Sequence, residues 1–263
     1  MKPLSRADQQ PTATFTSKGK KTRLDVLLVE RGLSESREQA QRSIMAGEVR
    51  VGDAVVDKAS SKIDPGADVS IEAASRYVGR GGLKLEGALR DFGISAVGST
   101  ALDIGASTGG FTDCLLQHGA KKVHAIDVGH GQLAWKIRSD PRVVVREKLN
   151  ARFLSRADVP EPVDLCVIDV SFISLTLILP RAFELVSPNG VILALIKPQF
   201  ELQASDVGRG GIVREAALHE KAQAKIRDFV AAEGQEVAGI VPSAITGTDG
   251  NQEFFACVRT RLA

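Results

Sequence analysis

The sequence predicts an α/β chain in which a Rossmann-like, mostly parallel sheet follows a small N-terminal α+β domain. In the stretch Ala101–Gln117, a buried apolar strand runs into a glycine turn and then into the start of a helix. Three later polar residues, Asp127, Asp169 and Lys197, each follow a short apolar strand, as expected at the carboxyl edge of such a sheet. Short helices and strands separated by glycine turns fill residues 21–75.

Length and composition agree with a large domain joined to a small one. The chain has 263 residues and 43% apolar content, enough to bury a sizeable core. Its three cysteines are scattered through apolar segments, which predicts free thiols in a reducing cytoplasm. The first 23 residues lack a secretory pattern, and no apolar run is long enough to cross a membrane. The four histidines have no ligand spacing, so we expect no metal site.

The N-terminal region divides into a tail and a small domain. Residues 1–20 are polar and lack periodicity, which predicts a disordered tail. Within residues 21–75, a Thr22-x-x-Asp25 capping pattern opens a first helix that ends at Gly32. A second helix, over residues 34–45, turns Ala40, Ile44 and Met45 inward, and valine-rich short strands follow it.

Basic side chains gather on or beside these two helices. Arg37 falls in the first turn of the second helix, where the helix dipole disfavours a cation by a few tenths of a kcal/mol. A phosphate bound nearby would make the cation favourable at this position. Ordinary solvated arginines remain the alternative for each residue taken singly. These basic residues are Lys21, Arg23, Arg37, Arg42 and Arg50, and it is the family resemblance carried by motifs along the chain that makes them candidate RNA-binding residues.

Residues 76–82, with the sequence RYVGRGG, are the expected linker between the two domains, because their glycines permit a hinge. The large domain then occupies residues 83–263, starting with a helix over residues 83–92. Its later part holds a loop over residues 200–211, rich in small residues and long enough for a substrate lid.

The glycine turn after the strand at residues 101–104 is the first candidate ligand site. Gly105, Gly109 and Gly110 allow the backbone to pass close to a ligand, and their G-x-x-x-G-G spacing disfavours the dinucleotide fingerprint G-x-G-x-x-G. Asp103 and Asp127, with these glycines between them, suggest a cofactor that carries adenosine, because a carboxylate at the second strand end can accept ribose hydroxyls. The alternatives are a purely structural strand-to-helix turn and an Asp127 that only starts the next turn.

Several separated motifs then show a resemblance to a known family. The chain contains SRYVGRGGLKL, LDIGASTGGF, DVSFISL, IKPQFE and GNQEFF, and over about residues 21–260 it resembles the TlyA family of haemolysin-like, FtsJ-type rRNA methyltransferases. The resemblance implies a seven-stranded sheet, S-adenosylmethionine as cofactor, and an N-terminal RNA-binding domain like that of small-subunit ribosomal protein four. The cofactor residues that it implies are Asp103, Gly105, Ser107, Gly109, Gly110, Phe111, Asp127 and Asn150.

The same resemblance implies a catalytic set of Lys84, Asp169, Lys197 and Glu253. Lys197 follows six apolar residues and needs a carboxylate partner, which Asp169 on a neighbouring strand could provide. Without the resemblance, Lys84 would be a solvated lysine and Asp169 a helix cap. Asp169 is followed by Val-Ser-Phe and not by the Pro-Pro-aromatic run of amino-group methyltransferases, which favours a hydroxyl target.

These residues predict methyl transfer to a ribose 2′-hydroxyl of ribosomal RNA. The hydroxyl is a poor nucleophile at neutral pH, so a partly desolvated Lys197 near Lys84 is expected to accept its proton, with Asp169 and Glu253 orienting the lysines. The resemblance points to cytidine in the large subunit and, in some members, the small subunit. An RNA-binding assembly factor without turnover and a membrane-lytic haemolysin stay open as alternatives.

Overall fold

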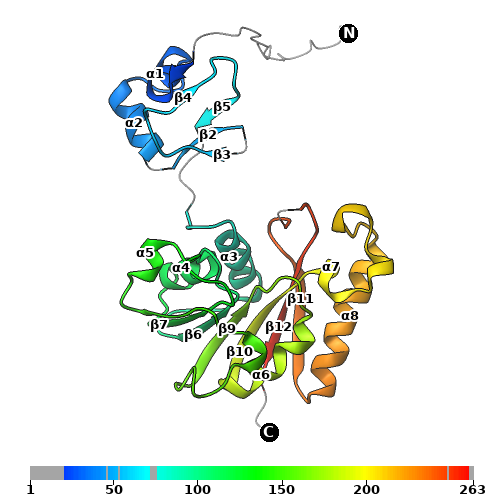
Figure 1. Cartoon of the computed structure of the whole chain (residues 1–263). Helices are drawn as coiled ribbons and strands as arrows, with labels where there is room; N and C mark the ends of the chain where they lie inside the picture. Colours follow the sequence, from blue (N-terminus) through cyan, green and yellow to red (C-terminus); the bar gives the residue numbers. More distant parts are fainter. Residues whose placement is uncertain (1–20, 46, 53, 72–75, 248, 261–263) are drawn as a thin grey trace, which may run out of the picture. The chain divides into compact units, whose positions relative to one another are not determined.

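The computed structural model describes residues 21–45, 47–52, 54–71, 76–247 and 249–260. The chain divides into two units, residues 1–75 and residues 76–263, and each has its own core (Figure 1). The expected tail over residues 1–20 lies outside the described residues. The first unit is a small α+β module and the second is a larger α/β unit, so the predicted fold class is confirmed.

The N-terminal unit packs two short helices against short antiparallel strands. Its elements are β1 (Thr22–Arg23), α1 (Leu24–Glu30), α2 (Arg37–Met45), β2 (Val49–Val51), β3 (Ala54–Val55), β4 (Lys62–Ile63) and β5 (Val69–Ile71). β1 pairs with β4, and β2 lies between β3 and β5. Ile44 is buried in this core, but Met45, predicted to face inward, is 69% exposed. Successive helical residues point in different directions, and Ile44 already fills the inward position.

One mostly parallel sheet of seven strands forms the centre of the large unit. The strands are β6 (Thr100–Ile104), β7 (Lys122–Ile126), β8 (Val143–Arg146), β9 (Val163–Ile168), β10 (Val186–Ile196), β11 (Glu236–Pro242) and β12 (Phe254–Arg259). Their order across the sheet is β11-β12-β10-β9-β6-β7-β8, and β12 runs opposite to the other six strands. After β8 the chain crosses back to β9, so the strand order reverses beside β6, where open α/β sheets bind ligands.

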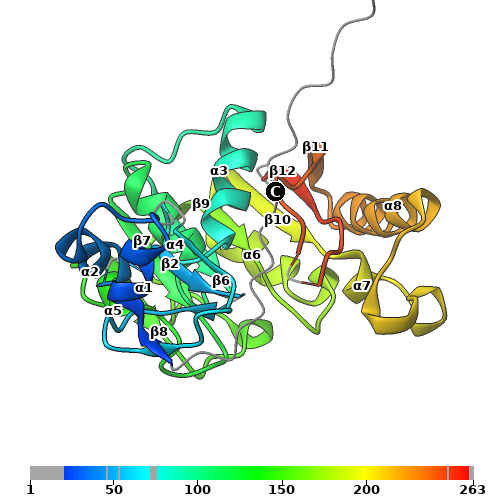
Figure 2. The same ribbon diagram turned by 90° about the horizontal axis from the view of Figure 1, so that it is seen from above.

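Helices cover both faces of this sheet. They are α3 (Gly81–Phe92), α4 (Gly110–Gln117), α5 (Trp135–Arg138), α6 (Leu179–Leu185), α7 (Pro198–Glu201) and α8 (Ala216–Ala232), with the short 3-10 turns η1 (Ala151–Phe153), η2 (Leu175–Leu177), η3 (Ala204–Asp206) and η4 (Arg209–Gly211). α3 and α4 share one core with Ala101 and Val123, whereas α6 and α8 share another with Leu102 and Ile104. α8 runs beside β10 and β11 (Figure 2). Because both faces are covered, the strands are apolar at nearly every position.

The segment expected to be a linker, residues 76–82, is built into the large unit. Tyr77 is buried in the core beneath α3, and the Val78 N–H donates to the Asp113 carboxylate at 2.9 Å. α3 begins at Gly81 and not at residue 83, and a Cβ on Gly82 would lie 2.2 Å from the Tyr77 ring. Glycines of this segment therefore serve close packing, and α3 includes its last two residues.

Candidate active site

The glycine turn after β6 brings two stretches of backbone into close contact. Gly105 has φ +90°, and a Cβ on it would lie 2.2 Å from the carbonyl oxygen of Asp169. Gly109 has φ +97° and precedes α4, and a Cβ there would lie 2.9 Å from the Leu133 side chain. Both positions require glycine for conformational reasons. Gly109 packs against Leu133 and lines neither cavity described below, and its contact with a cofactor stays a prediction.

A cavity of about 490 Å³ opens at the carboxyl ends of β6 and β7. Its lining is mainly apolar and includes Ile104, Ile126, Leu149 and Ile178, while Asp127, Asn150, Ser107 and Gln132 contribute polar groups. An apolar pocket with a few convergent polar groups is typical of a site for a small molecule. We call this the nucleoside cavity.

Asp127 joins two turns at the rim of the nucleoside cavity. Its Oδ2 accepts the Ser107 N–H at 2.8 Å, and its Oδ1 accepts the Gly129 N–H at 2.6 Å. The turn-forming role considered from the sequence is therefore real, and it coexists with a position on the cavity. A carboxylate offers about four lone-pair directions, so Asp127 retains the capacity to accept ribose hydroxyls. Asn150 accepts the Arg152 N–H through Oδ1, which leaves its amide nitrogen as the group available to a ligand.

Asp103 lies behind the glycine turn and not in either cavity. It is fully buried, and its Oδ2 accepts the Thr112 hydroxyl at 2.6 Å. Burial raises the pKa of Asp103 to about 7, with the charges of Asp169 and Asp127 acting in the same direction. Asp103 therefore anchors α4 from beneath, and its contact with a cofactor stays a prediction.

This burial predicts how stability depends on pH. An unfolded aspartate has a pKa of about 3.9, so the raised folded pKa favours the fold below about pH 4, and that contribution is lost as the pH rises to 7. Asp103→Asn keeps an acceptor for Thr112 without a charge. We expect this variant to exceed the wild type in unfolding free energy by about 2–4 kcal/mol at pH 8, and to match it near pH 4. Urea unfolding at both pH values measures this, and an equal difference at the two would contradict it.

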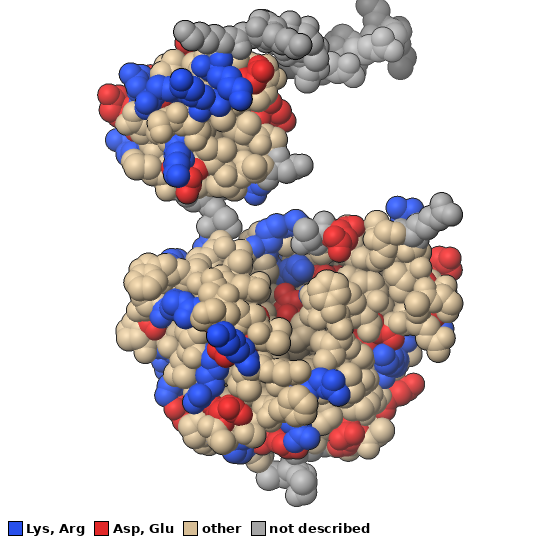
Figure 3. Space-filling view, in the orientation of Figure 1, with Lys and Arg blue, Asp and Glu red and all other residues tan. Residues whose placement is uncertain are grey.

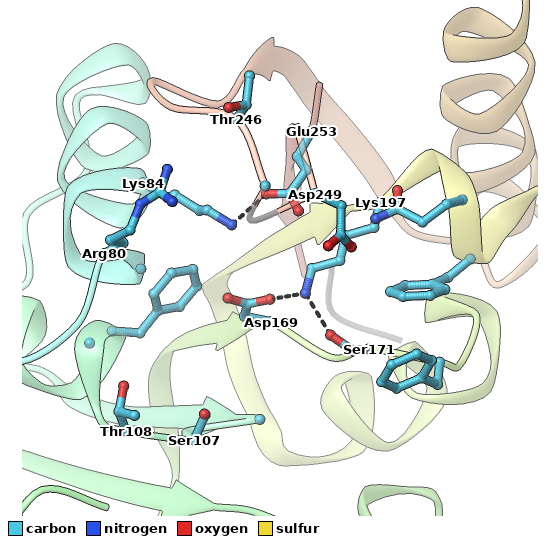
Figure 4. A pocket seen from close by; sticks show the side chains of 18 of the residues that line it. Arg80, Lys84, Ser107, Thr108, Asp169, Ser171, Lys197, Thr246, Asp249 and Glu253 are labelled. Atoms are coloured by element: carbon cyan, nitrogen blue, oxygen red, sulfur yellow. Dashed lines mark hydrogen bonds and ion pairs between the residues drawn. The ribbon is translucent and has the colours of Figure 1, made fainter. Parts of the chain in front are cut away.

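A second cavity, of about 610 Å³, adjoins the first and holds all four predicted catalytic residues. Lys84 comes from the start of α3, Asp169 follows β9, Lys197 follows β10 and Glu253 precedes β12 (Figure 4). We call this the catalytic cavity. Gly105, Ser107 and Asp169 line both cavities, so a ligand in one lies next to a ligand in the other.

The four residues form two lysine–carboxylate pairs. Lys84 Nζ lies 2.5 Å from Glu253 Oε2, and Lys197 Nζ lies 2.6 Å from Asp169 Oδ1. Both lysines are buried, so an unpaired ammonium at either position would be costly. Each carboxylate therefore holds the amino group of its lysine at a fixed place in the cavity. In the space-filling view, charged side chains lie at the bottom of a recess in the large unit (Figure 3).

The structure adds residues to this site that the sequence did not single out. Ser171 Oγ accepts from Lys197 Nζ at 2.9 Å. Phe172 is 90% exposed, has φ +64°, and its ring centroid lies 5.1 Å from that of Phe200. Both phenylalanines line the catalytic cavity, as does Arg80. Ser171 and Phe172 stand inside the DVSFISL motif, but the motif could not show which side chains face a ligand.

Two predicted cofactor residues, Gly110 and Phe111, line the catalytic cavity and not the nucleoside cavity. The Phe111 ring packs against Phe255, with centroids 5.9 Å apart. A Cβ on Gly110 would lie 3.0 Å from the Gly82 nitrogen, so this glycine lets α4 approach the start of α3. Both residues line the same cavity as Lys197, and their contact with a cofactor stays a prediction.

Asp25 organises part of the basic surface of the N-terminal unit. This carboxylate is fully buried and accepts from Arg23 at 2.9 Å, from Arg37 at 3.1 Å and from Gln41 at 2.8 Å. The Arg23 guanidinium holds the pKa of Asp25 well below its usual range. Asp25 therefore supplies the anion that Arg37 needs at the start of α2, and the inference of a phosphate from that position alone is corrected. Thr22 lies in β1 and does not cap α1.

The other candidate RNA-binding residues lie elsewhere on the same unit. Lys21 and Arg42 are exposed, whereas Arg50 is partly buried in β2. Lys and Arg side chains gather on one face of this unit (Figure 3). The guanidinium groups of Arg23 and Arg37 stay about half exposed while paired with Asp25. They can still reach an external anion.

The fold and the paired cavities define a methyltransferase of the FtsJ-like class joined to an S4 domain. The FtsJ-like methyltransferase family matches residues 77–260, and the S4 domain family matches residues 22–69. Within this class, the chain belongs to the TlyA family.

The relatives match over nearly the whole chain. YqxC of Bacillus subtilis is 51% identical over 89% of this chain and 84% of its own length. The 16S/23S rRNA (cytidine-2′-O)-methyltransferase TlyA of Mycobacterium tuberculosis is 43% identical over 92% of this chain and 91% of its own length. A solved hemolysin-like structure from Streptococcus thermophilus is 45% identical, covers 92% of this chain and 89% of its own, and has a TM-score of 0.71.

Proposed function

We propose that this protein transfers a methyl group from S-adenosylmethionine to ribose 2′-hydroxyls of ribosomal RNA. The observation that carries the proposal is the meeting of Lys84, Asp169, Lys197 and Glu253 in one cavity that adjoins a nucleoside-sized cavity. The chemistry needs both parts: a place for the methyl donor and a positioned base for a weakly acidic hydroxyl.

The nucleoside cavity fits S-adenosylmethionine in size and in chemistry. Asp127 would hold the ribose hydroxyls, Asn150 the adenine, and the apolar walls would cover the base. Gly105 has no side chain and packs closely against the Asp169 backbone. This leaves space where the methionine part of the cofactor would pass toward the catalytic cavity. When bound, this cofactor supplies an electrophilic methyl group on a sulfonium.

The protein's own residues handle the proton. With Lys197 unprotonated, its Nζ accepts the proton of the 2′-hydroxyl as the oxygen gains its methyl group. Asp169, at 2.6 Å, stabilises the ammonium that forms, and Ser171 fixes the direction of the amine. Lys84 is held across the cavity by Glu253, where its charge can orient the ribose and the neighbouring phosphate.

The N-terminal unit and the relatives support ribosomal RNA as the substrate. The S4 domain carries the basic residues described above, which suit contacts to the RNA backbone more than reading of bases. The Mycobacterium tuberculosis relative is named for cytidine in 16S and 23S rRNA. We therefore propose cytidine in the large subunit, with the small subunit as a second substrate, and a cytoplasmic site of action.

The direct test maps the modified nucleotide. Purified protein, labelled S-adenosylmethionine and ribosomal subunits that lack the modification are incubated together, and the RNA is then cleaved with alkali. Methylation of a 2′-hydroxyl blocks attack on the adjacent phosphate, so we expect one labelled, alkali-resistant linkage per site. Label that appears on a base, or RNA that binds without gaining label, would contradict the proposal and in the second case favour an assembly factor.

A membrane-lytic activity is the other function to test, because the chain is 44% identical to Hemolysin A of Brachyspira hyodysenteriae. Within the part of the chain that the structure describes, every helix is too short or too polar to cross a bilayer. Leakage of dye from liposomes by the purified protein would favour lysis. We expect none above the level of a heat-denatured sample.

Asp127→Ala should weaken binding of S-adenosylmethionine about a hundredfold, because a carboxylate that accepts hydroxyls is lost together with two backbone hydrogen bonds. Isothermal titration calorimetry measures the dissociation constant. Asp140→Ala is the matched control, since Asp140 pairs with Arg142 and lines neither cavity. Equal affinities for the two variants would remove Asp127 from the site.

A further inference from the structure

A buried carboxylate next to the catalytic cavity makes contacts that the proposed reaction does not use. Glu201, the last residue of α7, has a side chain that is 1% exposed. Its Oε1 accepts the Leu175 N–H at 2.7 Å, and its Oε2 accepts the Ser174 hydroxyl at 2.5 Å. Lys225 of α8 donates to the same Oε2 at 2.9 Å, to the Glu201 carbonyl oxygen at 2.8 Å and to Ser174 Oγ at 3.1 Å.

These contacts tie three separate segments together. Glu201 lies four residues after Lys197, and Ser174 lies three residues after Ser171. The network therefore joins α7, the loop of residues 169–175 and α8 immediately behind the residues that line the catalytic cavity. A buried carboxylate is costly unless it is paired and hydrogen-bonded, so Glu201 is stable here only while these three segments keep their positions.

The loop held by this network has a strained backbone. Phe172 is a bulky residue with a positive φ, an unfavourable arrangement that persists only when its surroundings hold it. Its ring contacts Phe200, which directly precedes Glu201. On its other side, Ser171 accepts from Lys197. The ring contact of Phe172 with Phe200 and the hydrogen bond of Ser171 with Lys197 therefore both depend on how the loop lies against α7.

We propose that Glu201 is a positioning residue, which with Lys225 clamps the loop of residues 169–175 onto α7 and so fixes Lys197, Asp169 and the Phe172–Phe200 wall for methyl transfer. The inference rests on the proposed function and adds a residue that touches neither cofactor nor substrate. Glu201 lines neither cavity, in agreement with an indirect role.

The first experiment compares Glu201→Gln and Ser174→Ala with the wild type. Gln keeps the size of the side chain but cannot accept both loop donors and pair with Lys225. Ser174→Ala removes the contacts of the Ser174 hydroxyl to Glu201 and Lys225 and its cap on Thr176, but it keeps the Glu201–Lys225 pair and the Leu175 N–H contact. We expect kcat to fall by about ten- to a hundredfold in Glu201→Gln and less in Ser174→Ala, because small displacements of reacting groups are costly. The dissociation constant for S-adenosylmethionine and the KM for RNA should change less than about threefold.

A second comparison separates positioning from loss of fold. In a Phe172→Ala background the loop has lost its aromatic wall, so Glu201→Gln should cost much less than in the wild type. A general loss of stability would instead lower kcat by the same factor in both backgrounds. Glu220→Gln is the matched control, because Glu220 is an exposed carboxylate of α8 paired with Arg227.

The possible results separate a failure of the proposed clamp from a failure of the proposed methyltransferase function. A wild-type protein that methylates no RNA overturns the proposed function. An active wild type with unchanged kcat in both Glu201→Gln and Ser174→Ala overturns the clamp alone. If Glu201→Gln fails to fold, Ser174→Ala and its combination with Phe172→Ala decide the question.

Discussion

Lys197→Ala should abolish methyl transfer and leave S-adenosylmethionine binding within about threefold of the wild type. We expect kcat to fall at least about a thousandfold, since a positioned base contributes roughly a hundred- to ten-thousandfold and the variant also leaves Asp169 without its partner. The nucleoside cavity does not include Lys197, so its contacts to the cofactor stay intact. Single-turnover transfer of label and calorimetric titration measure the two quantities separately.

Two further variants show whether the loss of methyl transfer is specific to Lys197 and whether Lys197 acts as the base. Lys221→Ala removes an exposed lysine that pairs with Asp206, and we expect full activity from it. Lys197→Arg keeps the positive charge but, with a guanidinium that stays protonated, cannot accept a proton, so it should be as inactive as the alanine variant. An active Lys197→Arg would show that Lys197 acts as a fixed cation and not as the base.

The sequence predicts the positions of those site residues that directly follow a strand. Asp127, Asp169 and Lys197 each follow an apolar strand of a parallel sheet, and such ends meet at one edge whatever the length of the intervening chain. The pairing of Lys197 with Asp169 follows from the cost of burying an ammonium alone. The place of Lys84 and Glu253 is different, because only the resemblance to a family indicated it.

The predicted residues that lie outside the cavities and the contacts that the sequence does not reveal share a physical cause. Asp103 and Gly109 stand in the motif of the turn, but the side-chain direction at each position depends on a strand pleat or a backbone torsion that the motif does not specify. Arg37 looked uncompensated because its partner, Asp25, lies twelve residues away on another helix. Tyr77 was assigned to a linker, although its ring fills the core beneath Gly82. Local patterns cannot report contacts that tertiary packing creates.

The second large effect is expected from a single methyl group at Gly105. The added Cβ would meet the Asp169 carbonyl oxygen at 2.2 Å, and this atom is backbone that cannot swing aside. Either the turn or the Asp169 segment must move by roughly 1 Å, a displacement able to cost a hundredfold in rate. We expect Gly105→Ala to lose at least about 3 kcal/mol of unfolding free energy.

Gly98→Ala is the control that isolates this clash. Gly98 also has a positive φ, +71°, but a Cβ on it meets nothing within 4 Å. Gly98→Ala should lower the unfolding free energy only by the cost of the left-handed conformation, about 1–2 kcal/mol. Its kcat and cofactor affinity should not change. Urea unfolding, calorimetric titration of S-adenosylmethionine and single-turnover transfer would be measured on both variants. Because Gly105 borders both cavities, its variant should lose affinity and rate together, and a Gly105→Ala protein as stable and active as Gly98→Ala would show that the two cavities do not depend on this backbone contact.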